Sequence, residues 1–354
     1  MFVYQIILVS RRSRYHAGTR YLTRGINPFG FVGNFVETEQ IVINSNKGAL
    51  GNPVCSSFVQ VRGSVPAYWF QETKVLTPKS PIHMNPSADI YFEATKKHFA
   101  DLFCMYGPNV FALNLVKKKE TTKREQFLTE IYQQAIDYIN LQIPDDLKII
   151  YYHQDMKALL KKDKEEFLNI TNTFGLVCLS KIGFFCADIS NKNRKPVPQT
   201  FQTGVLRSNC VDCLDRTNTF QQLLGEAALS LQIAKMYEMQ GQEALHHESF
   251  LDDITLKHFR EMFGRNGDII SLQYGGSIAH KTNFGHAPKQ IEFFTSLKRY
   301  YSNTFTDQYK QSAINLFLGL HKPNVRQPPL WETTAPIIWM PDTTYLANFI
   351  EMES

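Results

Sequence analysis

The sequence predicts a mixed α/β fold, and three observations indicate it. The first third of the chain shows the alternation of apolar and polar residues that is typical of strands. From Tyr91 onward, apolar residues recur every three or four positions, which is helical spacing. A chain of 354 residues with 43% hydrophobic content can also bury a substantial core, and no internal repeat or low-complexity linker divides it.

The first third is predicted to consist of strands. Residues 2–9, FVYQIILV, indicate a buried strand, because they are too few to span a bilayer and no basic region precedes them as in a signal peptide. Residues 25–34 are punctuated by glycine and proline and predict a turn-rich connection. Strand alternation returns at 36–43 and 56–70, the second with Val59, Val61 and Val65 on one face.

Helices are predicted next. One helix is expected over 91–103, with an apolar face of Phe92, Thr95, Phe99 and Phe103. Another is expected over 124–143, with a stripe of Phe127, Ile131, Ala135 and Tyr138. Residues 157–174 are a third helix candidate, whereas the residue types of 176–189 favour strands and 190–198 indicate a loop.

Charge is uneven along the chain. The formal net charge is only +5, but residues 1–24 hold five arginines and no acid, and five more basic residues lie within 117–124. Such patches suit an anionic partner, such as a phosphorylated lipid, a membrane surface or a nucleic acid, although a solvated face is the common explanation. Aromatic residues follow strand and helix spacing rather than the basic runs, so nucleic-acid binding is not expected.

The stretch 207–218, RSNCVDCLDRTN, is the strongest chemical signal. It lies between a predicted strand at 202–209 and a predicted helix at 217–240, so unpaired backbone N–H groups and the positive end of a helix dipole favour an anion there. The same groups and Arg216 would favour a thiolate at Cys210. An arginine fork can hold two phosphoryl oxygens, and Thr217 can offer its hydroxyl to the sulfur.

Other interpretations of the two cysteines carry less weight. A redox-active Cys-x-x-Cys pair is disfavoured, because the neighbouring acids would destabilise a thiolate. A zinc site would need about four ligands, and the sequence contains no second Cys-x-x-Cys motif to supply the other two. The remaining alternative is that both cysteines are buried and have only a structural role. Six cysteines in this length, without a secretory leader, indicate a reducing compartment.

RSNCVDCLDRTN resembles the signature of the Sac family of phosphoinositide phosphatases, whose phosphatase loop has the form Cys-x5-Arg. The resemblance extends to RRSRYHAGTRYLTRGIN, VETEQIV and FVQVRGSVPAYW upstream, and to SLQYGGS and RYYSNTFTDQYKQSAINLFLG downstream. It is closest to the branch that removes the 5-phosphate of phosphatidylinositol 3,5-bisphosphate. The resemblance implies a Sac catalytic core over 1–324, with the family's N-terminal β-rich subdomain largely absent, and a proline-containing acidic extension over 325–354.

The resemblance also implies roles for individual residues. Cys210 would attack the phosphate and Arg216 would orient it, while Asp215 or Asp212 would supply the leaving-group proton or instead fix the loop. The expected phosphate-binding residues are Val211, Cys213, Leu214 and Thr217. Cys213 could also form a reversible disulfide with Cys210, although simple packing is the plainer interpretation. Arg14, Arg20 and Arg62 are candidates for contacts with substrate or membrane, against the alternative of ion pairs with acids such as Glu37 or Glu39.

Partners and location follow from the resemblance alone. It implies a phosphoinositide at a membrane surface, peripheral attachment on the cytosolic face of endosomal, lysosomal or vacuolar membranes, and a complex with a helical-repeat scaffold and a phosphoinositide kinase. The cysteine mechanism needs no cofactor, although the resemblance allows magnesium. Two alternatives stay open: a weakly active core that binds phosphoinositide or a scaffold, and a protein tyrosine phosphatase.

Overall fold

The computed structural model describes residues 4–44, 53–71, 81–117, 125–189, 196–240, 251–279 and 306–320. The predicted extension at 325–354 and the basic run after Lys117 lie outside the described residues. No helix among those described is long and apolar enough to cross a bilayer.

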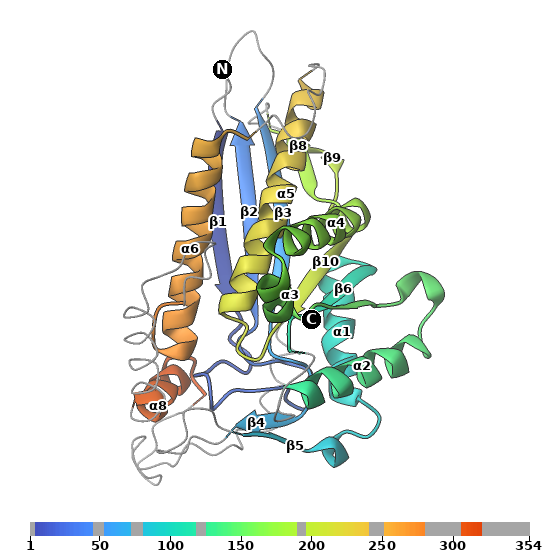
Figure 1. The fold of residues 1–354 in the computed structure, drawn as a ribbon, viewed down its shortest axis with the longest axis vertical. Helices are drawn as coiled ribbons and strands as arrows, with labels where there is room; N and C mark the ends of the chain where they lie inside the picture. The colour runs from blue at the N-terminus through green and yellow to red at the C-terminus, as the bar shows by residue number, and fades with distance from the viewer. Residues whose placement is uncertain are drawn as a thin grey trace.

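The prediction of a mixed α/β fold is confirmed (Figure 1). The strands are β1 (Tyr4–Arg12), β2 (Val36–Asn44), β3 (Val54–Arg62), β4 (Trp69–Gln71), β5 (Ile82–Met84), β6 (Asn109–Asn114), β7 (Ile150–His153), β8 (Phe185–Asp188), β9 (Val197–Thr200) and β10 (Gly204–Asn209). The α-helices are α1 (Glu93–Tyr106), α2 (Gln126–Asn140), α3 (Met156–Lys162), α4 (Lys164–Ile182), α5 (Asp215–Met239), α6 (Asp253–Gly275) and α8 (Asp307–Phe317).

One sheet organises the molecule, with the order β1-β2-β3-β10-β6-β7. β1, β2 and β3 are antiparallel, whereas β3, β10, β6 and β7 are parallel to one another. β8 pairs with the first half of β3, and β10 pairs with its end at Val61 and Arg62. The parallel strands therefore deliver their carboxyl ends to one edge of the sheet, where ligands of α/β folds commonly bind.

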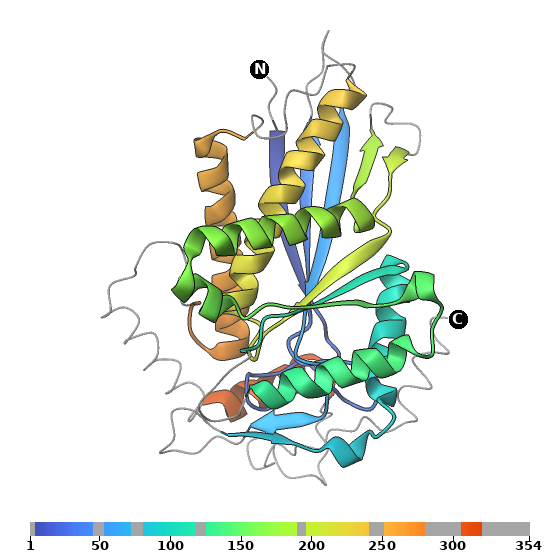
Figure 2. The same ribbon diagram turned by 45° about the vertical axis from the view of Figure 1, so that its right-hand side comes forward.

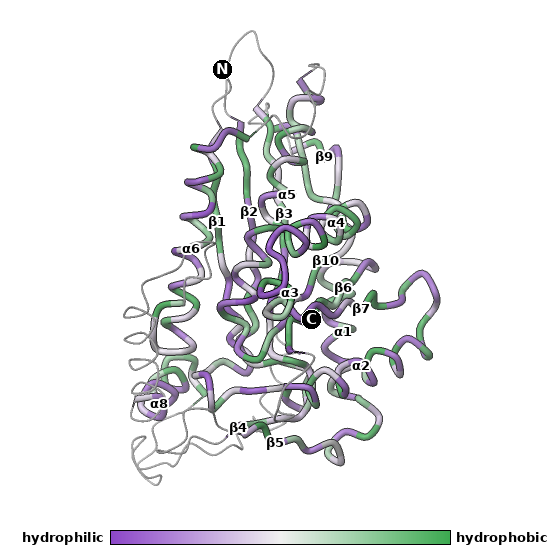
Figure 3. Tube along the Cα trace, in the orientation of Figure 1, coloured by the Kyte–Doolittle hydropathy of each residue, from purple (hydrophilic) through white to green (hydrophobic). Residues whose placement is uncertain are grey.

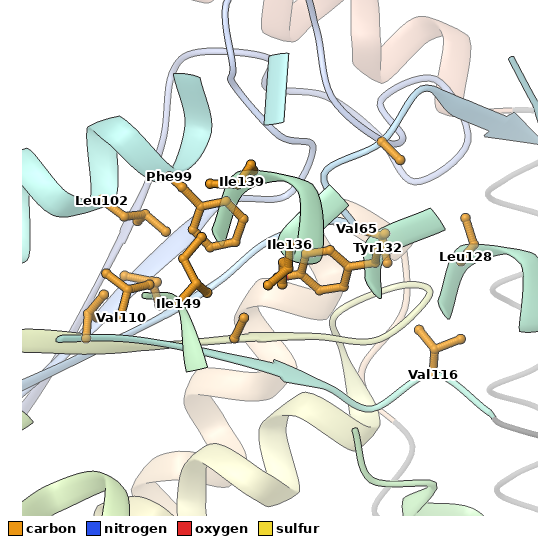
Figure 4. Close-up of a cluster of buried hydrophobic side chains, with 14 of the residues drawn as sticks. Val65, Phe99, Leu102, Val110, Val116, Leu128, Tyr132, Ile136, Ile139 and Ile149 are labelled. Carbon is orange, nitrogen blue, oxygen red and sulfur yellow. The ribbon is translucent and has the colours of Figure 1, made fainter. Parts of the chain in front are cut away.

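Helices cover both faces of the parallel strands (Figure 2). On one face α1 and α2 pack over β10 and β6 through a cluster that includes Phe99, Leu102, Tyr132 and Val205 (Figure 4). On the other face α4 and α5 pack over β3, β6 and β10, and α5 and α6 continue this layer over β2. Burial on both faces explains why β6 and β10 contain almost no exposed residue.

Hydropathy changes along β1 and β2. Figure 3 shows both strands as hydrophobic in one half and hydrophilic in the other. The hydrophilic half contains Arg11, which forms ion pairs with Glu37 at 3.0 Å and Glu39 at 2.6 Å. This half lies toward the end of the sheet at which β10 ends, so polar side chains gather there.

The predicted apolar stripe of the second helix is only partly correct. Ala135 is buried as predicted, but Phe127 is 48% exposed, and α2 also buries Leu128, Tyr132, Ile136 and Ile139. These residues recur at the helical period and face the sheet, whereas the predicted stripe starts on the solvent side.

Three other boundaries differ from the predictions. The third helix is interrupted at Asp163, whose carboxylate accepts hydrogen bonds from the N–H groups of Glu165 and Glu166 and so begins α4 as an N-cap. α4 then continues to Ile182 through the first half of the predicted strand at 176–189, because its apolar residues pack on α5. The strand predicted over 56–70 ends at Arg62, before Gly63, and a separate strand begins at Trp69.

Candidate active site

The motif at 207–218 forms the expected turn between a strand and a helix. β10 ends at Asn209 and α5 begins at Asp215, so the loop lies at the carboxyl edge of the parallel strands. Asn209 donates to the side chain of Asn114 at the end of β6, at 2.8 Å, and Leu115 donates its N–H to the Asn209 carbonyl at 2.8 Å. These bonds fix the loop between the two strand ends.

Cys210 has the surroundings of a nucleophilic thiolate. Burial by itself would raise the pKa of its thiol, but hydrogen bonding from Cys213, the charge of Arg216 and the hydroxyl of Thr217 lower that pKa to about 6. The Cys213 N–H lies 3.0 Å from the sulfur and the Thr217 hydroxyl lies 3.5 Å from it. Most Cys210 is therefore ionised at neutral pH.

The second cysteine shapes the loop. Cys213 has a φ of 54°, a left-handed conformation that is uncommon for a residue with a side chain. In that conformation its N–H faces the sulfur of Cys210, while its own thiol donates to the Gly63 carbonyl at 2.9 Å. Burial and the neighbouring Cys210 raise the pKa of Cys213 well above its ordinary value, so only one of the two thiols ionises. Leu214 is the N-cap of α5.

Arg216 lies in the first turn of α5 and is held at one nitrogen. Its Nη1 donates to the Leu115 carbonyl at 2.8 Å and to a carboxylate oxygen of Glu125 at 3.0 Å. Burial would lower the pKa of this guanidinium, but the charges of Cys210 and Glu125 raise it above the ordinary value. Arg216 is thus a permanent cation close enough to Cys210 to stabilise the thiolate.

Asp212 is anchored by two arginines from the segment between β1 and β2. Arg20 binds both of its carboxylate oxygens, at 3.0 and 2.7 Å, and Arg24 binds one of them at 2.6 Å. Arg24 also donates to the Val211 carbonyl at 2.7 Å. This double ion pair stabilises the carboxylate and ties two successive loop residues to one arginine, which favours the anchoring interpretation of Asp212.

Asp215 occupies the first position of α5, directly before Arg216. Its side chain is half-buried, whereas the carboxylate of Asp212 is held by Arg20 and Arg24. Of the two aspartates expected as proton donors, Asp215 is therefore the one whose position remains compatible with that role. The role itself stays a prediction.

A family model described as the SacI homology domain matches residues 2–161. A polyphosphoinositide phosphatase of the fission yeast Schizosaccharomyces pombe is 40% identical over 89% of this chain. The chain belongs to the SacI homology domain family. The match covers 38% of the yeast protein.

Other SacI relatives are named differently. A phosphoinositide phosphatase of Arabidopsis thaliana is 35% identical over 93% of this chain and 45% of its own length. A phosphatidylinositol-3-phosphatase of the same plant is 34% identical over 93% of this chain and 42% of its own length. The chain thus spans less than half the length of these curated relatives.

The three arginines expected to contact substrate or membrane lie in different environments. Arg14 is exposed and stacks over Tyr15, so a surface contact stays a prediction. Arg20 is part of the Asp212 anchor. Arg62 is only 1% exposed and binds Asn218, Gln221 and the Cys213 carbonyl beneath the loop. A membrane contact for Arg62 is therefore wrong, because strand β3 places it in the interior of the SacI domain.

Sequence reasoning assigned no site role to Arg24, Glu125 or the buried Arg207. Arg207 binds the Asn209 side chain, the Ser64 carbonyl and His98. Burial, and then the charge of Arg207, lowers the pKa of His98 well below the ordinary value. Arg24 and Glu125 reach the loop from distant parts of the chain, so local spacing gave no signal for them. Arg207 is the first residue of the motif itself, but its contacts with Ser64 and His98 depend on the fold. Only the arginine-rich segment around Arg24 was noticeable as a cluster.

Magnesium has no assigned ligands. Within the described ranges, no three His, Cys, Asp or Glu side chains come together in a way that would hold a metal ion. The carboxylates of Asp212 and Glu125 are engaged by arginines.

Proposed function

We propose that this chain is a phosphoinositide phosphatase that removes the 5-phosphate of phosphatidylinositol 3,5-bisphosphate through a phosphocysteine. The observation that carries the proposal is the Cys210 thiol, whose pKa of about 6 arises in a loop shared with Arg216. The names of the SacI relatives support a phosphoinositide substrate.

Catalysis proceeds in two displacements at phosphorus. The Cys210 thiolate attacks, the bond from phosphorus to the inositol oxygen breaks, and Asp215 gives that oxygen a proton. Water then attacks the phosphocysteine, and Asp215 accepts a proton from this water. The bond between phosphorus and sulfur breaks, which releases inorganic phosphate and restores the Cys210 thiolate. Arg216 and loop N–H groups stabilise the charge on the phosphoryl oxygens in both transition states. Thr217, already near the sulfur, stabilises the departing thiolate.

The 5-position is the finer part of the proposal. It is supported by the motifs that resemble the 3,5-bisphosphate branch and by the 40% identity with the yeast polyphosphoinositide phosphatase. A second candidate is removal of a 3-phosphate, because two relatives, from Arabidopsis and from Danio rerio, are named phosphatidylinositol-3-phosphatases at 34% and 30% identity.

The test is phosphate release from a panel of phosphatidylinositol phosphates in vesicles, measured with wild-type protein and with Cys210→Ser. Release from the 3,5-bisphosphate that leaves the 3-phosphate, and its loss in Cys210→Ser, is the expected result. Release from the 3-monophosphate would favour the second candidate, and faster release from phosphotyrosine peptides would favour a protein tyrosine phosphatase. Vesicle binding by wild type without any release would favour a binding or scaffold role. Undiminished release by folded Cys210→Ser would contradict the mechanism.

Location and assembly belong to the same proposal. We propose that the chain acts peripherally on its lipid substrate, at the cytosolic face of endosomal, lysosomal or vacuolar membranes. A helical-repeat scaffold and a phosphoinositide kinase are the proposed partners. Assays with EDTA and with added Mg²⁺ decide whether the metal contributes, since the proposed steps do not use it.

A further inference from the structure

Glu125 joins three parts of the chain beside the catalytic loop. One carboxylate oxygen, Oε2, accepts hydrogen bonds from Nη1 of Arg216 at 3.0 Å and from the backbone N–H of Lys117 at 3.1 Å. The other oxygen, Oε1, lies 3.3 Å from the Lys117 ammonium. Its side chain is only 13% exposed, so the carboxylate is held by the fold rather than by solvent.

The contacts of Arg216 are one-sided. Both of its protein hydrogen bonds, to Glu125 and to the Leu115 carbonyl, use Nη1. Among the residues that the structure describes, no acceptor is bonded to its Nε or Nη2, and the side chain remains 20% exposed. The protein therefore binds the guanidinium through Nη1 and leaves the N–H groups of Nε and Nη2 for another ligand.

That remaining pair has a defined chemical use. Nε and Nη2 lie on one edge of the planar guanidinium and present two parallel N–H donors, the geometry that binds two oxygens of a phosphate. An arginine that is free to rotate would lose this orientation, because its long side chain has many rotamers. Fixing Nη1 determines the plane and the direction of the free edge.

We propose that Glu125 is a positioning residue that orients Arg216 for phosphate binding. The proposal rests on the role of the Cys210 loop given under the proposed function, and it adds a residue that reaches the loop from 91 positions away. The carboxylate acts through Arg216 and does not touch the substrate. The alternative is that Glu125 only neutralises the arginine charge, in which case its removal would strengthen anion binding.

The experiment measures phosphate-analogue binding without requiring turnover. Bound orthovanadate, a phosphate analogue, should protect the Cys210 thiolate from alkylation by iodoacetamide. The orthovanadate concentration that gives half of the maximal protection measures its affinity for the catalytic loop. Wild type is compared with Glu125→Ala, Glu125→Gln and Arg216→Ala, with thermal unfolding of each as a folding check. Glu130→Ala is the matched control, because Glu130 lies on α2, is exposed, and among the described residues is hydrogen-bonded to Gln126.

Positioning predicts a graded loss. Glu125→Ala should weaken vanadate protection and lower kcat/KM by on the order of 100-fold, the scale of a small misplacement of a catalytic group. Glu125→Gln, which keeps an oxygen acceptor for Nη1, should recover part of both. In an Arg216→Ala background, Glu125→Ala should have no further effect, because the residue acts through that arginine. Glu130→Ala should match wild type.

Three results would overturn the proposal: wild-type protection in Glu125→Ala, tighter vanadate binding in that variant, or a full loss from Glu125→Ala in the Arg216→Ala background. If Glu125→Ala does not fold, Glu125→Gln alone and in the Arg216→Ala background supplies the same comparison. Failure of the wild type to release phosphate from lipids would contradict the proposed function, while vanadate protection would still decide the role of Glu125.

Discussion

At the scale of single residues, the site depends on one thiolate, Cys210, which stays ionised although acidic residues lie close to it. Asp212 would raise the pKa of Cys210, but Arg20 and Arg24 hold its carboxylate in ion pairs. Donors from Cys213 and Thr217 act directly on the sulfur. The loop therefore contains acids without losing its nucleophile, which answers the objection that neighbouring acids raise against a thiolate.

Alkylation of Cys210 should follow its lowered pKa. Below pH 6 the thiol is protonated and slow, and above pH 6 the thiolate reacts, so the iodoacetamide rate should rise with a midpoint near 6. In Thr217→Val the midpoint should move up by roughly 0.5–1 pH unit, because the thiolate loses a hydrogen-bond donor. The rate at Cys210 is measured by peptide mass spectrometry, with Cys210→Ser as background. A wild-type midpoint near 8.5 would contradict the assignment.

The two aspartates should respond differently to the leaving group. Asp215→Asn should slow phosphoinositide hydrolysis by about 10²–10⁴-fold but have little effect on an aryl phosphate whose leaving group needs no proton. Asp212→Asn should slow both substrates alike, because it weakens the anchor on the loop. Steady-state rates with both substrates provide the comparison. A leaving-group dependence in Asp212→Asn instead would exchange the two roles.

At the scale of elements, the predictions from sequence were best where a local pattern determines the structure. The strand and helix that flank the motif, the placement of Cys210 and Thr217, and the strands β1 and β2 follow from local sequence patterns. The first strand was expected to be buried, but β1 contains no buried residue, because it lies at the edge of the sheet. The apolar stripe of α2 was only partly correct, and the first half of the strand expected at 176–189 is helical, since packing against the sheet and against α5 decided those segments. Arg24 and Glu125 could not be found, because 188 and 91 residues separate them from their loop partners.

Close packing between α5, α6 and β2 should be visible in two glycines. A Cβ at Gly225 would lie 2.8 Å from the Phe263 ring and 2.9 Å from the Gln40 side chain, whereas a Cβ at Gly264 would meet nothing within 4 Å. We expect Gly225→Ala to lower the free energy of unfolding by about 1–3 kcal/mol through overpacking. Gly264→Ala should raise it by roughly 0.5–1 kcal/mol through helix propensity. Denaturant unfolding measures both, and stabilisation by Gly225→Ala would contradict the packing.

At the scale of the whole molecule, the catalytic loop is a meeting point of distant segments. The stretch between β1 and β2 reaches it through Arg20 and Arg24, and that stretch is in turn braced by Tyr274 of α6 and Gln311 of α8. The end of β6 reaches the loop through Leu115 and Asn114. The geometry of the catalytic loop therefore depends on the stability of these surrounding segments.

Arg14, an exposed basic residue in the segment between β1 and β2, should affect hydrolysis only when the substrate is in a membrane. Arg14→Ala should raise the half-saturating concentration of anionic vesicles about fivefold, the effect of losing roughly 1 kcal/mol of attraction. Hydrolysis of a soluble, short-chain phosphoinositide should remain unchanged. Lys148→Ala, which removes an exposed lysine paired with Asp145, is the control. Equal effects on vesicle and soluble substrates would place Arg14 in the site rather than at the membrane.

In the proposed mechanism Cys210 carries the phosphoryl group, and trapping this intermediate tests the mechanism. Wild-type protein is mixed with phosphatidylinositol 3,5-bisphosphate, denatured rapidly and cleaved with trypsin, and the peptide 208–216 is analysed by mass spectrometry. We expect one added phosphoryl group, located on Cys210 by fragmentation, and none in Cys210→Ser. Turnover without any labelled peptide, or a phosphoryl group on another residue, would contradict it.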